Sequence, residues 1–236
     1  MKLNSTEISK IETEIDTLRK AAGTAAGTLS SSRKKQALKV ETEVKKVLSQ
    51  LGIVNAEFKV NFVRSNADNA NDNFIWVKNK KYRCSENGID EIEFYISTNA
   101  GEDVKPLVKV ASGGEVSRIM LSLKTILAKS DKLPLLIFDE IDTGVSGRIA
   151  QKVGAALKDL ASFHQIISIT HLPQIAGMAD THFAVEKKQV DNRAVSSIKK
   201  LSDDERIIEV AKLISGEELS KASIESAKQL ILNKQN

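Results

Sequence analysis

The stretch LPLLIFDEIDTGVSG, residues 133–147, decides the fold because it joins a short apolar run to two adjacent acidic residues. An uninterrupted run of this length is typical of a parallel β-strand that is covered on both faces. Asp139 and Glu140 follow directly, and adjacent carboxylates at the end of a buried strand are costly unless a cation lies there. Mg²⁺ with a nucleotide phosphate fits, since the first carboxylate can orient the metal and the second can polarise water. Taken alone, the pair is slightly better explained as a loop opening that caps the next helix.

A second apolar run, QIISIT at residues 165–170, ends at His171. Because ligands of parallel sheets bind at the carboxyl ends of the strands, the imidazole is expected at the same edge as the carboxylates. There it can contact a terminal phosphate. A single histidine in a loop is more often a hydrogen-bonded structural residue, so His171 gains its weight from this setting.

The segment ASGGEVSRIML, residues 111–121, places Ser112, Gly113 and Gly114 at the start of an amphipathic helix. Glycines let the backbone approach an anion, and the first amides and the dipole of a helix favour negative charge. The alternative interpretation is an N-cap serine followed by a flexible turn. An isolated SGG does not decide between them.

Strands and helices alternate after residue 112, which predicts an α/β fold with a mostly parallel sheet flanked by helices. Ser202 and Glu205 form an expected capping box, and Gly216 can end that helix. Further helices are expected at 116–129 and 148–162 and near the C-terminus, a β-hairpin at 182–188 and 193–201, and strands at 56–63, 73–84 and 90–97.

The first fifty residues carry two narrow apolar seams at helical spacing: Ile8, Ile11, Ile15 and Leu18, and then Ala37, Val40, Val44, Val47 and Leu51. This spacing predicts either a coiled-coil arm or an amphipathic helical hairpin packed on its own domain. Gly23, Gly27 and the serines at 30–32 interrupt the period, which predicts a joint or a bend. We therefore expect an arm segment at 1–51 and a lobe at 52–236.

Composition is that of an ordinary globular protein, with 41% hydrophobic residues and a net charge of +4. The single cysteine, Cys84, cannot form an internal disulfide and has no catalytic pattern around it, which favours a reducing compartment. The N-terminal residues lack a signal core, and no stretch approaches the roughly 18 apolar residues of a membrane span. A cytoplasmic protein is expected.

Together, SGGE at a helix start, a strand ending in Asp-Glu and a strand ending in Thr-His resemble the signature, Walker B and switch-histidine motifs of ABC-type ATPases. The stretches KPLVKVASGGEVSRIMLSLK, DEIDTGVSG and ITHLPQIAGMADTHFAVEK are similar to the RecN family of SMC-like proteins. The resemblance covers most of residues 88–233. It implies a partial ABC-type head with an N-terminal coiled-coil arm, acting in repair and recombination of broken DNA. A nucleoid-associated location is implied with it.

The resemblance also implies the site, with ATP and Mg²⁺ as cofactors. Asp139 is expected to help hold Mg²⁺, Glu140 to activate the hydrolytic water, and His171 to contact the γ-phosphate. The signature residues are expected to reach the nucleotide of an opposing head, so a homodimer of heads is implied. Asp142 is given no catalytic role. The residues expected to contact nucleotide are Ser112, Gly113, Gly114, Glu115 and Ser146.

The sequence contains no GxxxxGK[ST] loop, and none of its glycines is followed by lysine. That loop supplies most phosphate contacts. In this family it lies in an N-terminal half, beyond a long coiled coil. We therefore expect half a head, with strands missing from its sheet and no partner for its coil. Hydrolysis is expected only with that N-terminal half, and not from the chain alone.

DNA is the expected partner, through its ends or single-strand and double-strand junctions and without sequence specificity. A non-catalytic module that docks on an intact homologue remains the alternative, and a transporter subunit is disfavoured by the opening coil. The basic residues are equally explained as solvated surface: Arg33, Lys34 and Lys35 on the arm, and Lys187, Lys188, Lys199 and Lys200 on the hairpin.

Overall fold

The computed structural model describes residues 5–67, 73–110, 113–128, 133–190 and 193–232. It contains two compact units, one formed by residues 1–45 with 57–110 and the other by residues 46–56 with 111–236. Each unit is described by itself. The functional division into an arm at 1–51 and a head lobe at 52–236 stays a prediction.

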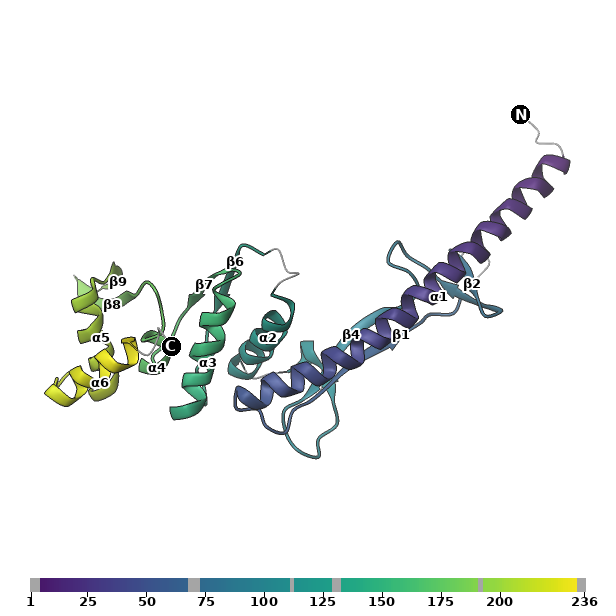
Figure 1. Ribbon diagram of the computed structural model, residues 1–236. Coiled ribbons are helices and arrows are strands. Elements are labelled where there is room, and N and C mark those ends of the chain that lie inside the picture. The colour runs from purple at the N-terminus through teal and green to yellow at the C-terminus, as the bar shows by residue number, and fades with distance from the viewer. Residues whose placement is uncertain (1–4, 68–72, 111–112, 129–132, 191–192, 233–236) are drawn as a thin grey trace. The chain divides into compact units, whose positions relative to one another are not determined.

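The first unit is built on the long helix α1, with a small antiparallel sheet and a hairpin beside it (Figure 1). The sheet has the strand order β1-β4-β5, and the hairpin joins β2 to β3. Its elements are α1 (Ser5–Gln50), β1 (Glu57–Val63), β2 (Phe74–Val77), β3 (Lys80–Arg83), β4 (Glu91–Ser97), β5 (Lys105–Pro106) and a short 3-10 helix, η1 (Leu107–Lys109).

Helix α1 runs without a break through the serine and glycine segment, so the joint and the helical hairpin, two of the alternatives that the sequence left open, are wrong. Gly23 lies in mid-helix because the backbone of β2 approaches it closely. A Cβ added there would lie 1.7 Å from the Trp76 carbonyl oxygen, whereas a Cβ at Gly27 would meet Val77 at an ordinary 3.6 Å. Gly23 therefore allows β2 to pack closely against α1 and does not interrupt the helix.

The two apolar seams of α1 have different surroundings. Ile8, Ile11, Ile15 and Leu18 are exposed, whereas Ala37, Val44 and Leu51 are buried against the chain itself. Only the first seam is left to pair with another helix, so a coiled coil there stays a prediction.

A buried carboxylate joins α1 to the strands of the first unit. Asp90 accepts hydrogen bonds from Ser30 Oγ at 2.8 Å and from Arg64 Nε at 2.9 Å, and Arg33 Nη1 lies 3.8 Å from its second oxygen. Because the Asp90 side chain is only 1% exposed, these cations offset the cost of its burial.

The second unit confirms the α/β class. Its one parallel pair is β6 with β7, and the other sheets of the described chain are antiparallel. The elements are α2 (Gly113–Leu127), β6 (Leu135–Phe138), α3 (Gly147–Leu160), β7 (Gln165–Ser168), α4 (Pro173–Ala176), β8 (Phe183–Val190), β9 (Arg193–Lys200), α5 (Asp203–Ser215) and α6 (Lys221–Leu232).

Only one face of the β6–β7 pair is covered in the described chain. Phe138 with the flanking Leu136 and Ile166 joins the core that α2 and α3 complete. The opposite face is exposed, with Ile137 at 63% and Ile169 at 58%. The expectation of a strand covered on both sides is therefore wrong for the described part of this chain, which lacks the second layer.

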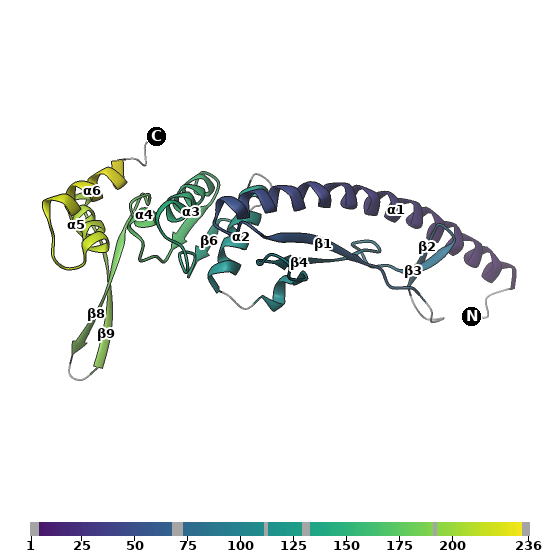
Figure 2. The same cartoon turned by 90° about the horizontal axis from the view of Figure 1, so that it is seen from below.

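The C-terminal elements follow the sequence signals. Ser202 and Glu205 form the expected capping box at the start of α5, and Gly216 caps its end. Strands β8 and β9 form the expected hairpin, which projects from this unit in Figure 2. Among the helices that the structure describes, none combines the length and apolarity needed to cross a membrane.

Candidate functional site

The two carboxylates at the end of β6 lie on a sharp turn. Both Asp139 and Glu140 are exposed, and the backbone amide of Glu140 donates to Asp139 Oδ1 at 2.9 Å. Glu140 has a φ of +57°, which costs a non-glycine residue on the order of 1 kcal/mol. Such strain persists where the surroundings fix it, and here helix α2 provides those surroundings.

The start of α2 lies directly against this turn. Ser117 Oγ donates to the Asp139 carbonyl oxygen at 2.7 Å. A Cβ on Gly113 would lie 1.9 Å from Glu140 Oε2, and one on Gly114 would lie 3.0 Å from the Glu140 carbonyl oxygen. The two glycines therefore make room for Glu140, whose carboxylate lies beside Gly113 at the start of α2.

Arg118 makes a second connection between α2 and the loop after β6. Its Nη1 donates to the Thr143 carbonyl oxygen at 2.7 Å, with the Ile141 carbonyl at 3.5 Å. Burial lowers the pKa of Arg118, and the nearby Glu115 opposes that effect. Sequence reasoning missed this residue, since its partners are backbone atoms that no motif marks.

Asp142 joins the end of β7 to the same loop. Its Oδ2 accepts from Thr170 Oγ1 at 2.6 Å and from the His171 amide at 2.9 Å, and His171 Nδ1 lies 3.1 Å away. The Asp142 side chain is 5% exposed and that of His171 is 73% exposed. A buried carboxylate therefore holds an outward-facing imidazole, a positioning role that the sequence did not reveal.

The structure joins Asp139, Glu140, Gly113 and Gly114 by contacts, and adds His171 through Asp142. Glu115 lies in the first turn of α2. Ser146 is exposed and precedes α3, where its side chain makes no capping hydrogen bond. Ser112 lies outside the described residues, so its expected nucleotide contact stays a prediction.

The residues at the strand ends fit a metal that arrives with a phosphate better than a metal held by protein alone. In the described part of the chain, no three His, Cys, Asp or Glu side chains gather as a metal site. Mg²⁺ bound with nucleotide needs only one or two carboxylates. The exposed Asp139 and Glu140 meet that requirement. A groove of about 430 Å³ belongs to the other unit and is lined by none of these residues.

Comparison with known proteins gives a consistent result. The DNA repair protein RecN of Halalkalibacterium halodurans is 40% identical over 95% of this chain and 38% of its own length. RecN of Bacillus subtilis is 37% identical over 95% of this chain and 39% of its own length. The chain thus spans less than two fifths of these curated relatives.

The structural comparison concerns the fold alone. The Smc head domain with a coiled coil and joint from Pyrococcus yayanosii matches with a TM-score of 0.50 at 18% identity, covering 78% of this chain and 30% of that chain. No protein-family model matches the chain.

Proposed function

Because this chain belongs to the RecN family and spans less than two fifths of its curated relatives, we propose that it is the part of an SMC-like ATPase head that carries the signature, Walker B and switch-histidine motifs. Its proposed role is ATP hydrolysis in the repair of DNA double-strand breaks and in recombination. One observation carries the proposal: contacts join residues 113–118, 139–143 and 170–171, which lie far apart in the sequence, at one edge of the β6–β7 pair.

The residue roles follow from this arrangement. Mg²⁺ bound with ATP would neutralise phosphate charge and polarise the phosphoryl group. Asp139 would help to hold the metal, and Glu140, whose backbone is left-handed with a φ of +57°, would accept a proton from water. His171 is engaged at Nδ1 by Asp142, so its exposed Nε2 side is the one available to a phosphate.

The head is proposed to be composite. The uncovered face of β6–β7, with Leu135, Ile137, Ile167 and Ile169 exposed, is the surface that a second layer of the head would cover. The phosphate-binding loop absent from this sequence would come from that layer, the N-terminal half of a RecN protein. Ser112, Gly113 and Gly114 would act on nucleotide held by a second head, so a homodimer of heads is the proposed working form.

The test uses the chain mixed with a separately expressed N-terminal RecN half. Glu140→Gln should lower ATP turnover by about 10²-fold or more, the contribution typical of a positioned general base. Glu225→Gln, at an exposed position on α6, removes the same charge and should leave turnover unchanged. Equal turnover by both variants would show that Glu140 has no such role and would favour a non-catalytic interaction module.

A further inference from the structure

The β2–β3 hairpin of the first unit has one face turned to the core and one face turned outward. Ile75, Val77 and Tyr82 pack in a cluster with Ala26 of α1 and with Ile89. The cross-strand pairs on the other face combine an aromatic with a basic residue, Phe74 opposite Arg83 and Trp76 opposite Lys81. At the turn, Lys78, Asn79 and Lys80 are all exposed. We call Arg19, Phe74, Trp76, Lys78, Lys80 and Lys81 the basic-aromatic patch.

The lysines of this patch are not neutralised by carboxylates of the described chain. Residues 73–83 contain four Lys or Arg and no acidic residue. Within the described part of the chain, Lys78, Lys80 and Lys81 have no carboxylate partner. Arg19 lies near the Asp16 carboxylate, which is itself paired with Lys20 at 2.7 Å.

Two of the basic residues that the sequence had suggested for DNA differ in this respect. Arg33 lies against Asp90, and Lys199 pairs with Glu205. The side chain of Lys188 lies outside the described residues. The hairpin tip is therefore a better candidate for an anionic ligand than Arg33 or Lys199.

Aromatic rings fix the position of two of these cations. Arg19 Cζ lies 3.8 Å from the Phe74 ring centre, and Lys81 Nζ lies 4.7 Å from the same centre and 5.1 Å from that of Trp76. The Trp76 ring is held in turn, because its Nε1 donates to Asp16 Oδ1 at 3.0 Å. A cation over a ring keeps its full charge and its N–H donors. Arg19 and Lys81 are therefore held in place and can still bind an anion.

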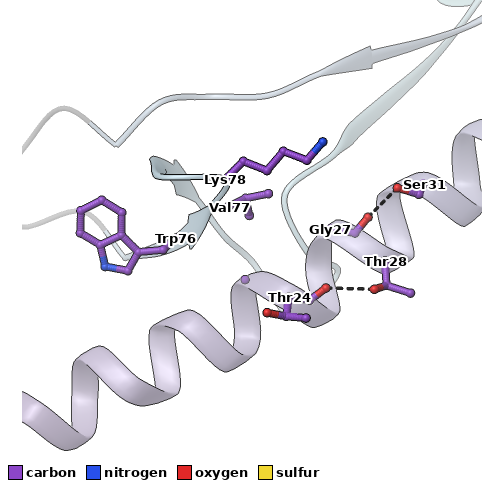
Figure 3. A pocket seen from close by; sticks show the side chains of 8 residues that line it. Thr24, Gly27, Thr28, Ser31, Trp76, Val77 and Lys78 are labelled. Carbon is purple, nitrogen blue, oxygen red and sulfur yellow. Dashed lines mark hydrogen bonds between the residues drawn. The ribbon is translucent and has the colours of Figure 1, made fainter.

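A groove runs beside the patch, between α1 and β2 (Figure 3). Its helix side consists of small residues, among them Gly27, Thr28 and Ser31, and Trp76 and Lys78 line its strand side. The hydroxyl groups of Thr28 and Ser31 donate to carbonyls of their own helix. The groove is thus lined by one aromatic ring, that of Trp76, and one ammonium group, that of Lys78. It lacks the converging polar groups that select a small molecule.

From these contacts we propose that the basic-aromatic patch binds a nucleic acid strand, with the lysines of the hairpin tip on its phosphates. Cations combined with aromatic faces are what sequence-independent binders of nucleic acid strands use, since phosphates meet the charges and bases can stack on rings. The inference deepens the proposed DNA-repair role and rests on it for the choice of DNA as the nucleic acid.

The test measures binding of a labelled oligodeoxythymidine, and of a duplex of the same length, to the full chain. The variant Lys78→Gln/Lys80→Gln/Lys81→Gln should bind about 10-fold or more weakly. The negative slope of log K against log salt concentration should become shallower by about 2. Matched in charge, Lys152→Gln/Lys221→Gln/Lys228→Gln changes three exposed lysines of the other unit and should bind like the wild type apart from a small general effect. Unchanged circular dichroism establishes that both variants fold.

Trp76 provides a second readout because it is the only tryptophan of the chain. Its fluorescence should change on titration with the oligonucleotide and saturate at the same concentration as the binding signal. A larger change with the single strand than with the duplex means that bases reach the ring, and an equal change means that phosphate contacts dominate. Both results support binding of nucleic acid at the basic-aromatic patch.

Three outcomes overturn the inference: equal affinities of the two triple variants, a silent Trp76 signal at saturation, or tight binding of poly-L-glutamate through the same lysines with none of DNA. The last would identify an acidic polypeptide as the ligand. Failure of the proposed ATPase role is separable, since ATP turnover of the reconstituted head without DNA should not respond to the lysine changes.

Discussion

The close packing of β2 on α1 leads to a prediction in which steric packing and helix propensity change the free energy of unfolding in opposite directions. Replacing glycine by alanine inside a helix stabilises it by about 1 kcal/mol when nothing else changes. At Gly23 the added Cβ would lie 1.7 Å from the Trp76 carbonyl oxygen, and at Gly27 it would lie 3.6 Å from the Val77 side chain. Two changes of identical chemistry, one helical turn apart, therefore meet different surroundings.

For Gly23→Ala the clash is between Cβ, whose position is fixed by the helix backbone, and a backbone carbonyl oxygen of Trp76, so no rotamer can relieve it and the hairpin must move. Overpacking of this kind costs about 1–3 kcal/mol, and displacing the hairpin also exposes Ile75. We expect a net loss of about 1–2 kcal/mol for Gly23→Ala and a gain of about 0.5–1 kcal/mol for Gly27→Ala.

Urea unfolding followed by Trp76 fluorescence reports this unit selectively, since the chain has no other tryptophan. The Gly23→Ala protein should also show altered emission before unfolding, because the ring would lose its hydrogen bond to Asp16. If Gly23→Ala proves as stable as Gly27→Ala, the close contact is wrong and Gly23 has no packing role.

Three further predictions concern the second unit. Gly113→Ala should push the Glu140 carboxylate from its place and lower turnover of the reconstituted head by about 10²-fold, with little change in stability because the clash meets the end of a flexible side chain; unchanged turnover would contradict this. Asp142→Ala leaves the part-buried Thr170 hydroxyl and His171 amide without their acceptor and should cost about 1–3 kcal/mol in urea unfolding, whereas the exposed Asp159→Ala should cost under about 0.5 kcal/mol. Burial lowers the pKa of His182 from its ordinary 6.5, so the unfolded chain binds the proton more readily and stability should fall as pH drops below about 6.5. His182→Gln should flatten this dependence of the melting temperature, and an identical slope in both proteins would rule out His182 as its source.

What the sequence predicted well depends on local signals. The capping box of Ser202 and Glu205 needs only residues three apart, and the parallel strands need only short apolar runs bounded by turns. The same runs placed Asp139 and His171 at strand ends that prove to lie at one edge. These features survive because neighbours in the sequence determine them.

The errors arise where residues far apart in the sequence determine the local structure or the role of a side chain. Glycine disfavours helix, so the sequence alone predicts a break at Gly23. Only the approach of Trp76, far along the chain, shows why a glycine is needed in mid-helix. The role of Asp142 depends on Thr170 and His171, which are 28 and 29 residues away. The exposed side chain of Ile137 belongs to a strand whose second covering layer is not in the described chain, and an apolar run cannot reveal that.

The most direct test of the central claim is ATP turnover of this chain, alone and mixed with the N-terminal half of a RecN relative expressed separately. A composite head predicts turnover in the mixture and none from the chain alone, since the sequence holds no phosphate-binding loop. Robust turnover by the purified chain alone would contradict the account, because the motif residues at the ends of β6 and β7 would then need no second segment.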